Sequence, residues 1–190
     1  MIEKLNSVEE NFKRIKNEVG EAAVRAGRSA EEIRLMAVTK TVEPVFINRA
    51  IACGADLIGE NRVQEFLSKK DGLDLDRCEA HLIGHLQTNK VRQIVGEVSL
   101  IQSVDSVKLA KEIGRCSVNK NIVSDILLEV NIGGEDSKFG FLPSEVYEKA
   151  CEISETEGIK ICGLMTVPPF DATKEQTSTF FSNMRQLFID

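Results

Sequence analysis

The fold is decided by a short stretch, residues 34–41, which reads Arg-Leu-Met-Ala-Val-Thr-Lys-Thr. Its apolar part, residues 35–38, has the length and the low polarity of a strand that is covered on both faces. The segment that follows, residues 44–52, has the character of a helix. Lys40 is therefore expected where a strand ends and a loop leads into a helix. In parallel α/β proteins, ligands bind at that edge of the sheet.

The same order of apolar run, polar loop and helical segment recurs along the chain. Alternating strands and helices predict a mostly parallel sheet with right-handed connections. No linker rich in proline, glycine or serine interrupts the order, so we expect one domain over residues 1–190. The expected strands are residues 35–38, 57–58, 81–83, 100–104, 126–132 and 160–167, and the helical segments lie near residues 44–53, 61–70, 88–96, 106–115, 144–156 and 173–188.

Six βα units can be counted in this way. A closed (β/α)8 barrel has eight units and typically about 250 residues, whereas an open doubly wound sheet needs five or six strands. Counting alone therefore favours the open sheet. The chain stops inside its last helical segment, at residues 188–190, which is the pattern expected of an interrupted chain.

Composition excludes several classes of protein. The net charge of −6, from 24 basic and 30 acidic residues, argues against a nucleic-acid partner. The apolar runs are too short to cross a bilayer, and the amino terminus has no signal-peptide core. Five scattered cysteines without a Cys-x-x-Cys pair predict neither disulfides nor a zinc site, and they fit a reducing cytoplasm.

Polar side chains lie at or near the ends of the predicted strands. They include Lys40, Asn61, His85, Asp105 and Glu129. Because parallel strands end at the same edge of a sheet, these side chains are expected to face one mouth, which is the default ligand site of such folds.

Lys40 has two readings. Taken alone, it fits a solvated loop lysine, because most lysines are exposed. A lysine that is partly desolvated at a strand end has a lowered pKa, and its neutral amine attacks carbonyls to form a Schiff base. The commonest biological carbonyl for this use is pyridoxal 5′-phosphate. Spacing does not select this cofactor over an aldehyde substrate.

Other candidate sites are weaker. His81 and His85 would face the same side of a strand, but no third metal ligand is evident, so we favour polar lining and expect no metal. No Gly-x-Gly-x-x-Gly or Walker motif is present, so the sequence lacks the phosphate-binding loop of the common nucleotide-binding folds. Residues 133–134, both glycine, precede two acidic residues and are interpreted as a turn.

Five stretches in order along the chain resemble one known family, the pyridoxal phosphate homeostasis proteins. The fold of that family is similar to the barrel domain of alanine racemase. His85 stands where the family more usually has proline. The stretches are residues 37–41 (AVTKT), 59–65 (GENRVQE), 81–90 (HLIGHLQTNK), 131–132 with 136–140 (NI and DSKFG), and 163–166 (GLMT).

The resemblance implies a (β/α)8 barrel that holds pyridoxal 5′-phosphate as a Schiff base on Lys40. It implies that Asn61 and Met165 lie beside the cofactor and that Val38 and His81 line the pocket. It further implies a cytoplasmic carrier or regulator in vitamin B6 homeostasis, without catalytic turnover and without a catalytic residue. We expect a monomer or a weak dimer that binds neither nucleic acid nor membrane.

The family's phosphate-binding loops are missing from this sequence. In the family's pattern these loops follow the last two strands and carry a Ser-x-Gly-Met-Ser and an Arg-x-Gly-Thr stretch, neither of which occurs here. With the count of six units and an amino-terminal helix, this predicts an incomplete (β/α)8 barrel that stops before its last two βα units. Each charge-assisted hydrogen bond lost to a phosphate is worth about 1.5–3 kcal/mol, so noncovalent cofactor affinity is expected to fall by orders of magnitude.

Two other functional classes stay open. An amino-acid racemase with the same cofactor needs a second base, usually a tyrosine, and the single tyrosine, Tyr147, is expected in a helix away from the strand ends. A protein-interaction module would use the apolar stripe of the amphipathic helix at residues 3–26. We favour packing of that stripe on its own domain. Gly27 is expected to end this helix, and Ser29 with Glu32 to form a capping box.

Overall fold

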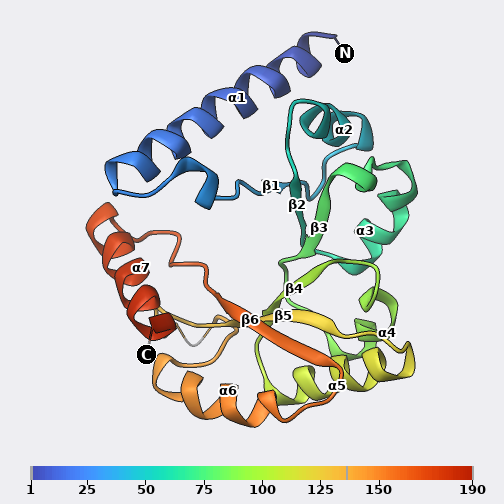
Figure 1. Ribbon diagram of the computed structural model, residues 1–190, viewed down its shortest axis with the longest axis vertical. Helices are drawn as coiled ribbons and strands as arrows, with labels where there is room; N and C mark the ends of the chain where they lie inside the picture. The colour runs from blue at the N-terminus through green and yellow to red at the C-terminus, as the bar shows by residue number, and fades with distance from the viewer. Residues whose placement is uncertain (1, 136, 190) are drawn as a thin grey trace. The chain divides into compact units, whose positions relative to one another are not determined.

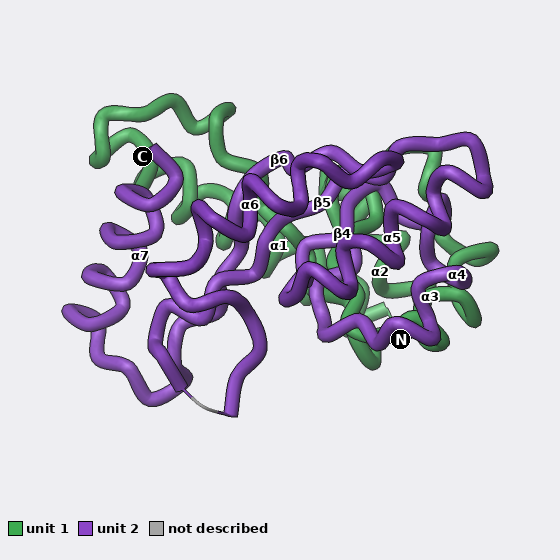
Figure 2. Tube along the Cα trace, turned by 90° about the horizontal axis from the view of Figure 1, so that it is seen from below, with its two compact units in different colours: residues 1–81 green, residues 82–190 purple. Residues whose placement is uncertain are grey.

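Parallel strands alternate with helices in the six βα units that the sequence predicts (Figure 1). The structure is a computed structural model that describes residues 2–135 and 137–189. Asp136, which belongs to one of the family stretches, lies outside the described residues, as do Met1 and Asp190. The chain divides into two units, residues 1–81 and 82–190, each of which we describe by itself (Figure 2). The expectation of a single domain stays a prediction.

The first unit carries its strands in the order β1, β2, β3. β1 pairs with β2 in parallel, with Ala37 opposite Ile58 and Val38 opposite Gly59. This register aligns the residues that follow the two strands, which matters for the site. The elements are α1 (Ile2–Arg25), η1 (Ala30–Glu32), β1 (Ala37–Val38), α2 (Pro44–Ala52), β2 (Leu57–Glu60), α3 (Val63–Lys69), η2 (Lys70–Gly72), η3 (Leu75–Arg77) and β3 (Glu79–Leu82).

Helix α1 packs on α2 through one part of its apolar stripe. Phe12 is buried in a cluster with Ala50 and Ala55, against which Val8 and Leu35 also pack. The packing of α1 on its own unit is therefore confirmed. The predicted signals at its end are also confirmed, since Gly27 has a φ of +75° and Ser29 forms a capping box with Glu32.

Strand β1 differs from the expected strand in length and in burial. The sequence predicts a strand over residues 35–38, but Leu35 packs against the Phe12 cluster and only Ala37–Val38 pair with β2. Val38 is 50% exposed, so the expectation that both faces are covered is wrong at this position. β1 ends the strand order of its sheet, so Val38 has a neighbouring strand on the β2 side only.

The second unit carries its strands in the order β4, β5, β6. Both pairings are parallel, and in the second of them Glu129 lies opposite Met165. The elements are η4 (Thr88–Lys90), α4 (Val91–Ile94), β4 (Leu100–Val104), α5 (Val107–Asn119), β5 (Ser124–Glu129), η5 (Pro143–Glu145), α6 (Val146–Ser154), β6 (Ile159–Met165) and α7 (Lys174–Ile189).

Strand β5 has one fully buried apolar pair, and Glu129 lies on the other face. Ile126 and Leu128 are fully buried, as are Ile113 of α5 and Ile153 of α6. Successive side chains of a strand point to opposite faces, so Glu129 lies on the face opposite this apolar core. The same alternation leaves Glu129 only partly buried. Over the described part of the chain, no helix is both long and apolar enough to cross a membrane.

Candidate functional site

Lys40 and Asn61 follow the ends of two neighbouring strands in the first unit. The pairing of Val38 with Gly59 is extended by a hydrogen bond of 3.0 Å from the Thr39 amide to the Gly59 carbonyl oxygen. Lys40 and Asn61 therefore follow soon after two paired strand ends, with Lys40 at the start of a turn. The structure thus brings these two predicted site residues to one edge of the sheet.

Lys40 itself is exposed, so the expectation of an amine shielded from water is not met within the described residues. The residue before it, Thr39, is only 4% exposed. The chain therefore turns from the interior to the surface within one residue, because β1 ends there. Val38 lies two residues earlier at the same edge, half exposed to solvent.

A buried ion pair lies directly beside these strand ends. Lys69 Nζ is 2.6 Å from Glu60 Oε1, and the two side chains are 7% and 0% exposed. The Thr39 hydroxyl donates to the same Glu60 oxygen, and Lys69 Nζ donates to the Thr39 carbonyl oxygen at 2.9 Å. Sequence reasoning missed Lys69, because a lysine in an amphipathic helix is ordinarily solvated.

Thr41, on the other side of Lys40, has an unusual backbone. Its φ is +61°, which is uncommon for a β-branched residue and costs on the order of 1–3 kcal/mol. The Thr41 amide donates to Glu65 Oε1 at 2.5 Å. This hydrogen bond, and the neighbouring Lys69 ammonium, lower the pKa of Glu65 from its ordinary value. The interaction offsets part of the backbone strain.

Two buried oxygen atoms at this edge have no hydrogen-bond donor among the described residues. They are Asn61 Oδ1 and Glu60 Oε2. A buried acceptor without a partner costs about 1–3 kcal/mol. A ligand group that donates a hydrogen bond to Asn61 would remove that cost, so this oxygen marks the edge as a place to bind a polar ligand.

His81 lies within β3 and is only 5% exposed. Burial lowers the pKa of the imidazole, and the neighbouring Glu79 carboxylate opposes that shift. His81 Nε2 is 3.3 Å from Glu79 Oε2 at the start of the strand. Glu79 is in turn paired with Arg34 at 3.1 Å. The contact between His81 and Glu79 therefore lies near the start of β3.

Met165 is the last residue of β6 and belongs to the second unit. It is partly buried, and its carbonyl oxygen accepts a hydrogen bond from the Val130 amide at 2.8 Å. The role of Met165 beside a cofactor stays a prediction. The turn expected at residues 133–134 is confirmed, since the Gly134 amide donates to the Asn131 carbonyl oxygen at 3.2 Å.

A second polar cluster lies at the strand ends of the second unit. His85 Nδ1 is 2.8 Å from Asp105 Oδ2, and the His85 ring stacks on Phe139 with 3.7 Å between the ring centroids. Burial and the nearby Asp105 charge raise the pKa of Glu129 to about 7, while His85 opposes the shift. The sequence predicts these residues at one mouth, but it does not predict their pairing.

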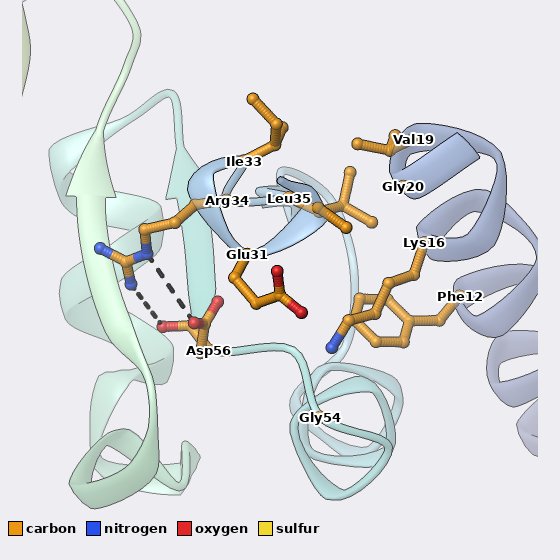
Figure 3. Close-up of a pocket in the computed structure, with 11 residues that line it drawn as sticks. Phe12, Lys16, Val19, Gly20, Glu31, Ile33, Arg34, Leu35, Gly54 and Asp56 are labelled. Atoms are coloured by element: carbon orange, nitrogen blue, oxygen red, sulfur yellow. Dashed lines mark hydrogen bonds and ion pairs between the residues drawn. The ribbon is translucent and has the colours of Figure 1, made fainter. Parts of the chain in front are cut away.

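A separate cavity of about 420 Å³ lies in the first unit between α1 and the segments that precede β1 and β2 (Figure 3). Phe12 and Lys16 line it from α1. Arg34 lines it from the other side and is bound to Asp56, with 3.8 Å between Nε and Oδ2. Because Arg34 and Asp56 precede β1 and β2, the cavity lies at the opposite strand ends from Lys40. It contains no predicted site residue.

Comparison with known proteins gives concordant matches. The family model described as the alanine racemase N-terminal domain matches residues 4–188. A protein of Aquifex aeolicus named pyridoxal phosphate homeostasis protein is 42% identical over 179 residues, which cover 94% of this chain and 78% of that protein. A Pseudomonas aeruginosa protein with the same name is 30% identical over 186 residues, which cover 98% of this chain and 81% of that protein.

Solved structures agree in fold. A protein of unknown function from Bifidobacterium adolescentis has a TM-score of 0.92 at 35% identity, covering 96% of this chain and 78% of that one. PipY of Synechococcus elongatus, solved with pyridoxal phosphate bound, has a TM-score of 0.76 at 30% identity, covering 88% of this chain and 78% of PipY. The fold is therefore that of the alanine racemase barrel domain, represented here by six βα units. The chain belongs to the pyridoxal phosphate homeostasis protein family.

Proposed function

We propose that this chain binds pyridoxal 5′-phosphate and holds it covalently through Lys40. The observation that carries the proposal is the parallel pairing of Val38 with Gly59, which places Lys40 and Asn61 just beyond two neighbouring strand ends. Asn61 Oδ1 is buried there without a donor among the described residues. PipY, a relative at 30% identity, has been solved with this cofactor bound, which supports the same ligand here.

The donor set of this edge fits the cofactor. Pyridoxal 5′-phosphate supplies an aldehyde that condenses with an amine, and its ring hydroxyl is a hydrogen-bond donor. Lys40 supplies the amine, and Asn61 Oδ1 supplies an acceptor for a ring substituent. Val38 and His81 are proposed to line the pocket beside Lys40 in the first unit, and the role of Met165 beside the cofactor stays what the family resemblance implies.

The proposed biological role is a carrier or regulator of cofactor supply without turnover. The similar proteins of Aquifex aeolicus and Pseudomonas aeruginosa are named homeostasis proteins. Tyr147, the single tyrosine of the sequence, lies on α6 and is 75% exposed. This position does not suit the second base that a racemase needs beside its substrate. The cytoplasm is proposed as its compartment, since all five cysteines are free thiols, as a reducing environment requires.

Borohydride trapping tests the proposal. The chain is incubated with excess pyridoxal 5′-phosphate, reduced and digested, and the adduct mass is expected on the peptide that contains Lys40. Lys40→Ala should abolish that adduct, while Lys108→Ala, at an exposed lysine of α5, should leave it unchanged. A wild-type chain without a Lys40 adduct, or an undiminished total adduct in Lys40→Ala, would refute the proposal.

The alternative is a racemase that uses the same cofactor. The half-buried Glu129 beside Asp105 and His85 is the observation that favours it, because a carboxyl group with a pKa of about 7 can exchange protons near neutral pH. Incubation of the loaded protein with L-alanine and chiral analysis of the product separates the two functions. Clear turnover that Lys40→Ala removes would replace the carrier role by an enzymatic one.

A further inference from the structure

Side chains of helix α3 hold both peptide groups that flank Lys40. On the amino-terminal side, the Thr39 carbonyl oxygen accepts a hydrogen bond from Lys69 Nζ at 2.9 Å. On the carboxyl-terminal side, the Thr41 amide donates to Glu65 Oε1 at 2.5 Å. Since peptide groups are planar, these two contacts restrict the orientation of the two planes between which the Lys40 side chain leaves the backbone.

The two helix residues act as one connected unit. Glu65 and Lys69 are four residues apart, so they lie on the same face of α3. Lys69 Nζ is 3.1 Å from Glu65 Oε1 and 2.6 Å from Glu60 Oε1, so with Thr39 each of its three N–H groups has an acceptor. The network therefore links α3 to the ends of both β1 and β2.

A simple helix ion pair accounts for only part of this arrangement. Pairs of glutamate and lysine four residues apart are common on helices and add little stability. Such a pair does not require that both members reach the main chain on either side of one residue. It also does not require Lys69 to be buried or Thr41 to adopt a φ of +61°. Positioning of Lys40 explains these features together.

We propose that Glu65 is a positioning residue for Lys40. It holds the peptide after Lys40 directly and the peptide before Lys40 through Lys69, and so directs the amine toward a bound aldehyde. The inference rests on the proposed function, because it assigns a role in bond formation at Lys40. In that step the neutral Lys40 nitrogen forms a C=N bond with the aldehyde carbon. Its two protons leave with the aldehyde oxygen as water, without oxidation or reduction.

The first measurement needs no cofactor. Glu65→Ala removes the acceptor of the Thr41 amide, whose hydrogen exchange with solvent is expected to speed up by about tenfold or more. Glu65→Gln retains a carbonyl oxygen at the same place and should restore most of the protection. Gln64→Ala, at the exposed neighbouring position of α3, is the matched control and should not change the exchange rate.

The second measurement is the rate of the borohydride-trapped Lys40 adduct at several concentrations of pyridoxal 5′-phosphate. For Glu65→Ala we expect the maximal rate to fall by about tenfold, with little change in the concentration that gives half of it. Glu65→Gln should recover the rate, which a role confined to overall stability does not predict. If Glu65→Ala fails to fold, Glu65→Met, which keeps the length of the side chain, takes its place with the same expectations.

The outcomes separate this inference from the proposed function. If Glu65→Ala traps the cofactor at Lys40 as fast as the wild type, the positioning role is overturned and the cofactor site stands. Unchanged hydrogen exchange at Thr41 in Glu65→Ala also overturns the positioning role. A wild-type chain that gives no Lys40 adduct overturns the proposed function and this inference with it.

Discussion

Replacement of Glu129 by glutamine gives a quantitative test of the polar edge in the second unit. Glutamine keeps the size of the side chain and removes its charge. Burial, reinforced by the Asp105 charge and opposed by His85, raises the pKa of Glu129 to about 7 in the folded chain. The ordinary value is 4.5, so the folded state keeps a proton that the unfolded chain releases between these two values.

The sign of the effect follows from this difference. As the pH rises from about 4.5 to 7, the wild type loses free energy of unfolding, and above about pH 7 the loss is complete. A shift of this size corresponds to about 3–4 kcal/mol at most. Because Glu129 is only partly buried, solvent screening reduces the expected figure to about 1–2 kcal/mol. Glu129→Gln does not lose free energy of unfolding in this way. Between about pH 4.5 and 7 its free energy of unfolding should therefore rise by that amount relative to the wild type.

Urea unfolding between about pH 5 and pH 8 measures the difference. Asp105 and His85 are present in both chains, so their own titration largely cancels when the two are compared. Glu155→Gln, at an exposed residue beside α6, is the control and should follow the wild type at every pH. A difference between Glu129→Gln and the wild type that is constant across this range would refute the assigned burial of the Glu129 carboxyl group.

Three further substitutions test the packing around the sites by chemical unfolding. Lys69→Met leaves the fully buried Glu60 without its partner and should destabilise the chain by about 3–5 kcal/mol, most of which Glu60→Gln in the same chain should restore. Leu128→Ala removes a fully buried side chain and should cost about 2–5 kcal/mol; a cost below 1 kcal/mol would contradict the burial of β5. Gly140→Ala should cost at least about 1 kcal/mol, because Gly140 has a φ of +108° and an added Cβ would lie 2.8 Å from the Asn131 nitrogen.

The strands could be predicted because each is a short apolar run between a helix and a polar loop. The expected strand at residues 100–104 matches β4 (Leu100–Val104), and residues 160–167 overlap β6 (Ile159–Met165). The end of β5 could not be predicted, since the apolar pattern continues to residue 132 while the strand ends at Glu129. Strand ends depend on the neighbouring strand, which the local sequence does not specify.

The part of the candidate site that depends on strand ends could be predicted from the sequence. The part that depends on side-chain packing could not. Lys40 and Asn61 could be assigned to one edge because each follows a strand. The burial of Lys69 could not, since it requires Glu60 and the Thr39 carbonyl oxygen to meet the same ammonium group. Spacing of four residues between Glu65 and Lys69 is the one trace of this network in the sequence.

Exposure does not distinguish Lys40 from other lysines of this chain, because Lys108 is also exposed. An aldehyde reagent can reach both, so a preference for Lys40 has to come from orientation and from neighbouring groups. Lys108 lies on a regular helix. The peptide groups on either side of Lys40, by contrast, are hydrogen-bonded to the network of Glu65 and Lys69. Asn61, which follows the neighbouring strand, has a side-chain oxygen that can accept a hydrogen bond. A reacting group that is oriented before its partner arrives loses less entropy in the reaction. At limiting pyridoxal 5′-phosphate the Lys40 adduct should therefore form before the Lys108 adduct, and equal rates would show that the α3 network has no part in the selection.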